Sequence, residues 1–172
     1  GKKVCVVLPA YNAAKTLAQV YRKIPQKAAT YIILVDDGSK DNTVKIAQKL
    51  KPFTVVHKQN IGYGGNQKTC YQTALKRGAD YVIMLHPDGQ YDPHDLPKFV
   101  TKLTQGADLV LGSRFLSHGD KQTPLYKSLS IRVITFLFNL ILGTHLSEAN
   151  TGYRGFSRRL LETVPWHKNG NS

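Results

Sequence analysis

The sequence predicts an α/β fold in one domain, built as a doubly wound, mostly parallel sheet. Three observations lead to this prediction. Short apolar runs alternate with segments of helical periodicity, which is the pattern of βαβ units. The 172 residues suit a single domain, and neither a linker nor an internal repeat divides them. Aspartate, glycine and proline follow the ends of the apolar runs, where a parallel sheet presents its ligand crevice.

Five apolar runs are expected to form the strands of this sheet. They span residues 4–8, 31–35, 53–57, 81–85 and 107–112. The first two are apolar throughout rather than alternating, so they read as strands buried on both faces. Pro9 is expected to end the first strand, because proline cannot donate a hydrogen bond to the ladder.

Helical periodicity fills the segments between these strands. Asn12 and Asp41 are expected to cap two of the helices, because short polar side chains accept hydrogen bonds from first-turn N–H groups. The expected helices run over residues 13–24, from the residue after Asp41 to Leu50, from the glycine-rich loop to Arg77, and over residues 95–104.

Positive charge dominates the chain. Lys and Arg number 24 against 11 Asp and Glu, which gives a formal net charge of +13. Such a surface attracts anions, among them nucleic acid, anionic lipid and phosphorylated substrates, and charge alone does not choose among them. The two cysteines, Cys5 and Cys70, have no metal-type spacing and are expected to be buried, reduced thiols.

A further apolar segment, residues 129–142, is expected to be a helix with a wide apolar face. It is too short to cross a bilayer, which takes about 20 residues. Its apolar face belongs either to the core or to the membrane surface, and we favour the surface for part of it. The sequence contains no signal peptide and no clear transmembrane run.

Acidic residues and glycines follow the ends of three expected strands. Asp36 and Asp37 follow the second strand, a glycine-rich loop around Gly62 follows the third, and Asp88 follows the fourth. The carboxyl ends of parallel strands meet at one edge of the sheet, where helix N-termini favour phosphate groups. Asp88 suits a divalent cation that is shared with substrate phosphates, although Pro, Asp and Gly are also ordinary turn residues.

Two common nucleotide-binding signatures are absent from the sequence. Gly62-Tyr63-Gly64-Gly65-Asn66-Gln67 lacks the third glycine of the dinucleotide fingerprint, and no Walker lysine followed by Ser or Thr occurs. A dehydrogenase or a P-loop enzyme is therefore disfavoured. The loop suits direct phosphate contact and equally a close turn that needs positive φ.

Five short motifs occur in order along the chain. They are Leu8-Pro9-Ala10-Tyr11-Asn12, Val35-Asp36-Asp37-Gly38-Ser39, Asn60-Ile61-Gly62, Asp88-Gly89-Gln90 and Gly112-Ser113-Arg114-Phe115. In this order they resemble the motifs of family 2 glycosyltransferases, closest to the dolichyl-phosphate and polyprenyl-phosphate hexosyltransferases. The resemblance implies a glycosyltransferase-A fold, a single doubly wound Rossmann-like domain, with a nucleotide-binding half of about residues 1–92 and an acceptor-side half of about residues 93–172.

The same resemblance implies a nucleotide-sugar donor and assigns its nucleoside end to the first motifs. Pro9 and Tyr11 would line the nucleobase and ribose pocket, Asp36 would hydrogen-bond the base, and Asp37 and Gly38 would shape the same wall. The full set of expected donor-binding residues is Pro9, Tyr11, Asn12, Asp36, Asp37, Gly38, Gly62 and Gln90.

A Mn²⁺ or Mg²⁺ cofactor is implied at the fourth strand. The family usually carries an Asp-x-Asp motif there, and Asp88 matches its second aspartate while His86 stands in the first position. Asp88 would bind the metal and, through it, the donor diphosphate, beside Gln90. A neutral imidazole binds transition metals or donates to phosphate, so His86 is expected to favour Mn²⁺ or to act in the outer coordination shell.

The acceptor side is implied by the later motifs. Glu148 matches the acidic residue that faces the acceptor, where it serves as a base or positions the acceptor or the metal. Arg114, Arg132 and Arg154 are the expected acceptor-phosphate ligands, because a guanidinium matches phosphate oxygens in a bidentate way. Asp88, Glu148 and Arg114 are the expected catalytic residues.

Together these expectations describe a metal-dependent inverting glycosyltransferase at the cytosolic membrane face, peripheral or anchored by a segment outside this chain. It would transfer a hexose from GDP-mannose, ranked first, or UDP-glucose to a dolichyl or polyprenyl phosphate. One alternative is a family 2 enzyme with a saccharide hydroxyl acceptor, for which Glu148 must act as base. A second is a nucleotidyltransferase-like enzyme of sugar nucleotides, which would release diphosphate from a nucleoside triphosphate. A third is a basic module that binds nucleotide or nucleic acid, but the aromatic and basic interleaving of single-strand binders is absent, so no nucleic-acid partner is expected.

Overall fold

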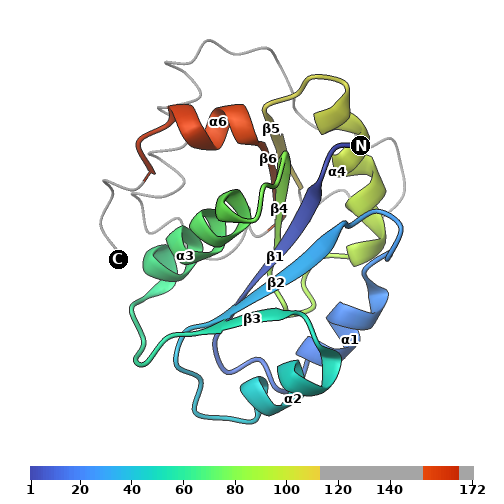
Figure 1. Cartoon of the computed structure of the whole chain (residues 1–172). Helices are drawn as coiled ribbons and strands as arrows, with labels where there is room; N and C mark the ends of the chain where they lie inside the picture. Colours follow the sequence, from blue (N-terminus) through green and yellow to red (C-terminus); the bar gives the residue numbers. More distant parts are fainter. Residues whose placement is uncertain (113–152, 167–172) are drawn as a thin grey trace.

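A six-stranded sheet forms the centre of the structure, a computed structural model that describes residues 1–112 and 153–166. The strand order is β3-β2-β1-β4-β6-β5 (Figure 1). Neighbouring strands among β1 to β4 pair in parallel, whereas β6 is antiparallel to both β4 and β5. The strands are β1 Val4–Ala10, β2 Tyr31–Asp36, β3 Phe53–Val56, β4 Tyr81–Leu85, β5 Leu109–Leu111 and β6 Tyr153–Ser157.

Helices cover both faces of this sheet and give three layers (Figure 1). The helices are α1 Leu17–Lys23, α2 Thr43–Leu50, α3 Tyr63–Lys76, the 3₁₀ turn η1 Pro93–Asp95, α4 Leu96–Thr104 and α6 Arg158–Thr163. The helices α1, α2 and α4 contribute buried side chains to one core cluster, and α3 and α6 contribute to the other. The predicted doubly wound α/β fold with a mostly parallel sheet is confirmed.

Alternation along β1 explains how one strand serves two cores. Val4, Val6 and Leu8 pack in the cluster with α1, α2 and α4. Cys5 and Val7 pack in the cluster with α3 and α6. Successive side chains of a strand point to opposite faces, so an apolar run without alternation is buried on both sides. The expected burial of Cys5 and Cys70 is confirmed, since both thiols are free and fully buried.

Pro9 does not end β1, contrary to the sequence prediction, because the strand continues to Ala10. Pairing of β1 with β4 stops at Val7, whereas pairing with β2 continues through Pro9. The carbonyl of Ala10 accepts from Asp37 on the β2 side, so the nitrogen of Pro9 faces the side where the ladder has already ended. The missing N–H therefore costs no hydrogen bond of the sheet.

The helix predicted over residues 13–24 starts later than expected, at Leu17. Asn12 is not its cap, because this residue has φ 50° and its side chain accepts from the backbone N–H of Lys40 at 2.9 Å. The backbone N–H of Ala13 donates instead to Thr43 Oγ1 at 2.8 Å. These hydrogen bonds connect the turn after β1 to the loop after β2 and to the start of α2, so residues 12 and 13 do not begin a helix.

The strand β6 was not predicted from the sequence. Gly155 gives β6 an irregular pattern, yet a Cβ at this position would lie only 3.1 Å from Leu103 Cδ1 and 3.2 Å from Phe99 Cδ1. A larger residue at this position would have to displace these two side chains of α4, so glycine favours the close approach of α4 to β6. The helix predicted over residues 129–142 lies outside the described residues. Within the described ranges, no helix has the length and apolar character needed to cross a bilayer.

Candidate functional site

The carboxyl ends of β1, β2, β3 and β4 form one edge of the sheet. The chain runs outward from β1 through β2 to β3 and then returns to β4 on the other side of β1, so the topological switch point lies between β1 and β4. Open α/β sheets bind ligands at such a point, outside the carboxyl ends of the strands. Asp36 is the last residue of β2, and the loops that follow β1, β3 and β4 carry Tyr11, Gly62 and Asp88.

Hydrogen bonds hold these loops to one another. The backbone N–H of Asn12 donates to Ser39 Oγ at 2.8 Å, which joins the loops after β1 and β2. Thr16 Oγ1 donates to the carbonyl of Pro87, which joins the loop after β1 to the loop after β4. The expected edge of the sheet is therefore one connected surface. On it, Pro9 is buried within β1, whereas the side chain of Tyr11 is half exposed.

Asp36 ends β2 and is fully buried. Its Oδ2 accepts from the backbone N–H of Ser39 at 2.9 Å. Its Oδ1 is also buried but has no hydrogen-bond partner within the part of the chain that the structure describes. A buried acceptor without a donor is costly, so this oxygen suits a ligand N–H group.

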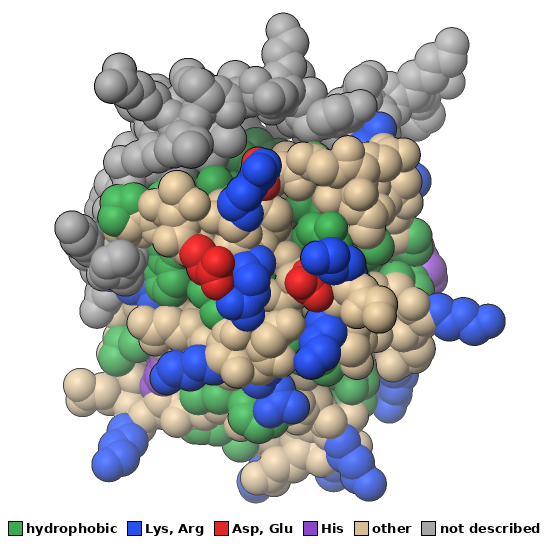
Figure 2. All heavy atoms as spheres, turned by 45° about the horizontal axis from the view of Figure 1, so that its top comes forward, with side chains coloured by type: hydrophobic (Ala, Val, Ile, Leu, Met, Phe, Trp, Pro, Cys, Tyr) green, Lys and Arg blue, Asp and Glu red, His purple; other side chains and the backbone are tan. Residues whose placement is uncertain are grey.

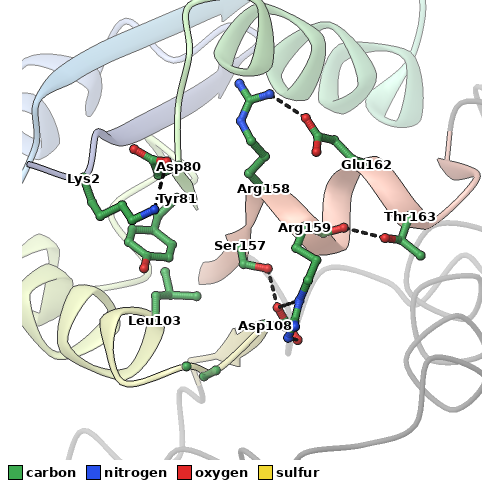
Figure 3. Close-up of a pocket in the computed structure, with 12 residues that line it drawn as sticks. Lys2, Asp80, Tyr81, Leu103, Asp108, Ser157, Arg158, Arg159, Glu162 and Thr163 are labelled. Atoms are coloured by element: carbon green, nitrogen blue, oxygen red, sulfur yellow. Dashed lines mark hydrogen bonds and ion pairs between the residues drawn. The ribbon is translucent and has the colours of Figure 1, made fainter.

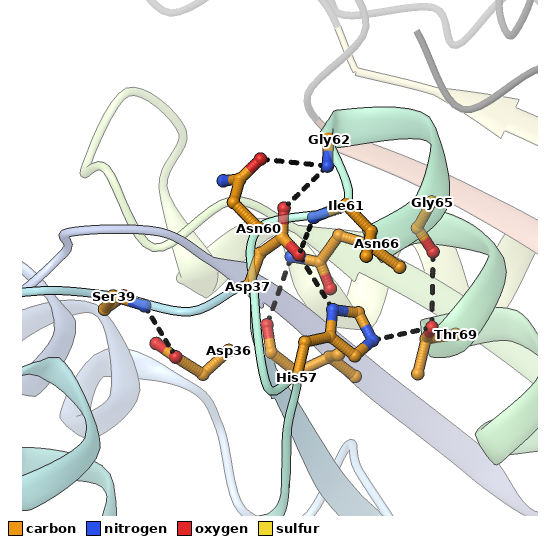
Figure 4. A network of polar contacts seen from close by, with 11 residues as sticks. Asp36, Asp37, Ser39, His57, Asn60, Ile61, Gly62, Gly65, Asn66 and Thr69 are labelled. Carbon is orange, nitrogen blue, oxygen red and sulfur yellow. Dashed lines mark hydrogen bonds and ion pairs between the residues drawn. The ribbon is translucent and has the colours of Figure 1, made fainter.

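Asp37 has a different environment, although it is the next residue (Figure 4). Its Oδ1 accepts from the N–H of Ile61 at 3.0 Å and from His57 Nδ1 at 2.8 Å. Its Oδ2 accepts from the N–H of Gly62 at 3.1 Å, and His57 Nε2 lies 2.9 Å from Thr69 Oγ1 on α3. Asp37 therefore fastens the glycine-rich loop and the start of α3 to the end of β2. Its predicted part in forming the donor wall stays a prediction.

Gly38 and Gly62 have the positive φ that glycine tolerates, 73° and 87°. A Cβ on Gly38 would lie 2.9 Å from the backbone nitrogen of Asn60, so the loop after β2 touches the loop after β3. Gly62 precedes α3 and has no side chain that would cover the helix N-terminus. Gly62 therefore adopts the positive φ that this turn requires, while its contact with phosphate stays a prediction.

Asp88 lies in the exposed loop after β4. Its Oδ1 accepts from the backbone N–H of Gln90 at 3.0 Å, and Gln90 is exposed beside it. No group of three or more His, Cys, Asp or Glu side chains suited to a metal occurs among the described residues. An exposed carboxylate fits a Mg²⁺ or Mn²⁺ ion that takes its remaining ligands from substrate phosphates and water. Asp88 is thus the described residue that would hold such an ion.

His86 forms part of a chain of three polar side chains from three elements. The hydroxyl oxygen of Tyr63, at the start of α3, lies 2.9 Å from His86 Nε2. The same oxygen accepts a hydrogen bond from Arg154 Nη2 on β6 at 2.8 Å. The side chain of Arg154 is almost completely buried, with 1% exposed. Burial and then the positive charge of Arg154 lower the pKa of His86 to about 3, so the imidazole is neutral at physiological pH.

The remaining predicted site residues lie outside the described part of the chain. They are Arg114, Arg132 and Glu148, and their roles stay predictions. Conversely, the structure shows three polar residues at this edge that the sequence reasoning did not assign: His57, Tyr63 and Thr69. Their positions beside the glycine-rich loop were visible in the sequence. Their partners were not, because the contacts need the folded sheet.

A hollow of about 520 Å³ lies at the opposite, amino-terminal edge of the sheet (Figure 3). Its charged groups pair with one another, since Arg158 contacts Glu162, Arg159 contacts Asp108, and Lys2 lies 3.5 Å from Asp80. Figure 2 shows acidic side chains on this face with Lys or Arg beside them. These pairs leave the hollow without a concentrated charge of one sign, so the candidate site is the carboxyl edge.

Solved structures with similar folds define the fold class of this chain. The glucosyl-3-phosphoglycerate synthase of Mycobacterium tuberculosis superimposes with a TM-score of 0.63 at 23% identity, over 94% of this chain and 59% of that one. S. aureus TarS superimposes with a TM-score of 0.60 at 18% identity, over 93% of this chain and 48% of that one. The fold is the glycosyltransferase-A fold of these enzymes, as predicted.

Sequence comparison gives the family. Residues 5–164 match the family described as glycosyl transferase family 2, and the chain belongs to this family of glycosyltransferases. The UDP-N-acetylglucosamine–dolichyl-phosphate N-acetylglucosaminyltransferase of Methanococcus voltae is 30% identical, over 95% of this chain and 72% of the relative. The polyprenol monophosphomannose synthase of Mycolicibacterium smegmatis is 26% identical, over 95% of this chain and 64% of the relative.

The predicted kinship with the polyprenyl-phosphate branch is confirmed. The chain spans about half to three quarters of the lengths of these four proteins.

Proposed function

We propose that this chain transfers a hexose from a nucleotide diphosphate sugar to a polyprenyl or dolichyl phosphate, with inversion at the anomeric carbon. The observation that carries the proposal is the placement of Asp36 and Asp88 on either side of β1, beside the switch point. Asp36 offers a buried acceptor oxygen to a nucleobase N–H, and Asp88 offers an exposed carboxylate to the metal of the diphosphate. A nucleotide sugar needs both kinds of group.

In the proposed reaction, an oxygen of the lipid phosphate forms a bond to the anomeric carbon. The bond from that carbon to the diphosphate breaks at the same time, and the nucleoside diphosphate leaves with the electron pair. The phosphate is already ionised at neutral pH, so no general base is required. A divalent ion held by Asp88 would supply positive charge to the departing diphosphate. Arg114, Arg132 and Arg154 are the proposed ligands of the acceptor phosphate.

Arg154 is the member of this arginine set that lies within the described residues. Its guanidinium is buried and donates a hydrogen bond to Tyr63, so its positive charge lies beside the loop of His86. From there it would act on the acceptor phosphate through its field or after a change of partner. Arg114 and Arg132 are proposed from the sequence alone.

The sugar and the base are finer proposals. GDP-mannose and UDP-glucose are the donors expected from the sequence, and UDP-N-acetylglucosamine joins them because the Methanococcus voltae relative carries it in its name. The metal is proposed as Mn²⁺ or Mg²⁺, and one crystal structure of the Mycobacterium tuberculosis synthase with this fold is a complex with Mn²⁺ and UDP. The proposed location is the cytosolic membrane face, which the net charge of +13 favours.

A transfer assay tests the proposal. The protein is incubated with each labelled donor, Mn²⁺, and either dolichyl or undecaprenyl phosphate, and lipid extracts are analysed for the sugar phosphate lipid. Label in the lipid fraction from one donor is expected. Transfer to a saccharide hydroxyl alone, abolished in Glu148→Gln, would favour the alternative acceptor. Release of diphosphate from a nucleoside triphosphate would contradict glycosyl transfer.

A further inference from the structure

His57 follows directly after β3 at the carboxyl edge of the sheet, where it contacts the end of β2 and the helix α3 (Figure 4). Its backbone N–H donates to the carbonyl of Asp36 at 2.9 Å. Its Nδ1 lies 2.8 Å from Asp37 Oδ1, and its Nε2 lies 2.9 Å from Thr69 Oγ1 in the second turn of α3. One residue therefore joins both aspartates at the end of β2 to α3.

This bridge needs only one feature of the imidazole, a proton on Nδ1. A carboxylate accepts hydrogen bonds and has none to donate, so Nδ1 is the donor to Asp37. The hydroxyl of Thr69 can donate to Nε2 or accept from it, so this second contact forms with a neutral ring and with a protonated one. The bridge from Asp37 to Thr69 is thus independent of the charge on His57.

Asp37 extends the bridge to the glycine-rich loop. Its Oδ1 accepts from the backbone N–H of Ile61 as well as from His57, and its Oδ2 accepts from the backbone N–H of Gly62. Gly62 immediately precedes α3. Rotation of the carboxylate would break these hydrogen bonds, and the bond from the imidazole opposes that rotation. The place of the loop relative to β2 therefore depends on His57.

A second histidine and aspartate pair shows what burial adds. His94 Nδ1 lies 2.8 Å from Asp92 Oδ1, the same distance as between His57 and Asp37. The exposed fractions of the side chains are 65% and 60% in this second pair, against 13% and 3% in the first. Water competes for exposed groups, so exposed pairs contribute little, whereas a buried hydrogen bond to a charged group contributes more. The first pair also joins segments 20 residues apart, whereas the second lies within one turn.

We propose that His57 is a positioning residue for the nucleotide-sugar donor, because it holds the glycine-rich loop and the start of α3 at a fixed place relative to Asp36. The inference rests on the proposed function, in which the donor extends from Asp36 to the metal at Asp88 and passes the loop around Gly62. Both ring nitrogens of His57 face protein groups, so His57 itself does not touch the donor. It favours binding because a loop that is already held in place loses less freedom when the donor binds.

Three substitutions of His57 separate its two contacts. In His57→Asn, the amide nitrogen lies near the position of Nδ1 and can still donate to Asp37. In His57→Gln, the amide nitrogen lies near the position of Nε2 and reaches only Thr69. His57→Leu removes both contacts while it retains an apolar side chain of comparable size. His94→Leu is the matched control, because it removes the exposed histidine of the second pair.

Amide hydrogen exchange of the free protein measures how firmly the loop is held. The amides of Ile61 and Gly62 should exchange about tenfold faster or more in His57→Leu and His57→Gln, because each variant loses the hydrogen bond to the carboxylate. His57→Asn should stay close to the unaltered protein, and His94→Leu should change these rates less than about threefold. The amides of β1 are recorded in the same spectra, and the acceleration in the loop should exceed any acceleration there, which reports global unfolding.

The transfer assay then measures the effect on the donor. The donor KM should rise about tenfold in His57→Leu and His57→Gln, while the KM for the polyprenyl phosphate stays unchanged and His57→Asn restores the donor KM. A variant that is merely less stable would contain less folded enzyme. It would show a lower apparent kcat with both KM values unchanged, and that result would overturn the proposal.

Equal exchange rates at Ile61 and Gly62 in all variants would also overturn the proposal, and so would a His57→Asn protein that behaves like His57→Leu. If the unaltered protein transfers sugar from none of the donors, the proposed function fails, and the inferred effect on the donor fails with it. The exchange rates then still decide whether His57 holds the glycine-rich loop, so the two failures are distinguishable.

Discussion

Asp36 and Asp37 are adjacent and almost equally buried, with 0% and 2% exposed, yet their carboxylates differ in use. Asp37 accepts two backbone N–H groups and an imidazole, so both its oxygens serve the fold. Asp36 keeps one buried oxygen without a partner in the described ranges. Side-chain alternation at the end of β2 separates the two roles, since neighbouring residues point in different directions.

Asp37→Asn should lower the free energy of unfolding by about 2–4 kcal/mol, because an amide group cannot replace a carboxylate that accepts on both oxygens. Urea denaturation measures the loss. Asp92→Asn is the control, because that side chain is 60% exposed and, among the described residues, its hydrogen bonds lie within its own turn. The control should change stability by less than about 1 kcal/mol. Equal losses in both variants would refute the structural role of Asp37.

The sequence was sufficient to place Asp36, Gly62 and Asp88 at one edge of the sheet, because each follows an apolar run. The sequence alone did not predict the hydrogen-bond partners of His57 and Tyr63. His57 meets Asp37 across 20 residues and Tyr63 meets Arg154 across 91. Such contacts depend on strand order, which local patterns do not contain.

At the scale of elements, strands were more predictable than helix starts. Four apolar runs coincide with β1 to β4, because an apolar run between turn residues has few alternatives in a parallel sheet. The first helix began late because loop residues 12–14 bond to the loop after β2 and to the first residue of α2. The strand β6 was missed because Arg154 and Gly155 break the apolar pattern, although both are buried in the fold.

The contact between the loops after β2 and β3 gives a test at this scale. Gly38→Ala places a methyl group against the Asn60 backbone at a positive φ, so it should cost about 3 kcal/mol. Gly89→Ala has a similar φ of 79° but open space around the Cβ, so it should cost about 1 kcal/mol. Thermal and urea unfolding compare the two. A Gly38→Ala protein as stable as Gly89→Ala would show that the loops do not touch.

For the whole molecule, the charge of +13 predicts salt-sensitive attraction to anionic membranes. Flotation with vesicles that contain phosphatidylserine should carry the protein upward at low salt. Binding should fall steeply as the ionic strength approaches 1 M, where the screening length is about 3 Å. Vesicles of phosphatidylcholine alone are the control. Equal binding to both vesicle types would contradict an electrostatic contribution.

Stability should also fall in acid. The backbone N–H of Lys3 lowers the pKa of Asp80, and the backbone N–H of His94 lowers the pKa of Asp92. Burial alone would raise the pKa of Asp108, but hydrogen bonds from Arg159 and Ser157 lower it overall. Because folded pKa values are depressed, this stabilisation is present above the ordinary Asp value of about 3.9 and is lost as the pH falls below it.

Urea midpoints at pH 7 and pH 3 test the acid prediction, with the midpoint expected to be lower at pH 3. Asp108→Asn should reduce the difference between the two midpoints, because this variant removes one of the titrating groups. A midpoint that rises on acidification would show that other groups dominate the pH dependence.

Donor binding is central to the proposed function, and calorimetric titration measures it most directly. The protein is titrated with GDP, UDP and their sugars, with and without Mn²⁺, and the titrations are repeated with Asp88→Ala. We predict that one nucleotide series binds, that Mn²⁺ strengthens binding, and that Asp88→Ala removes the Mn²⁺ effect while the protein stays folded. Absence of binding by both nucleotides, or an undiminished Mn²⁺ effect in Asp88→Ala, would contradict the proposed function.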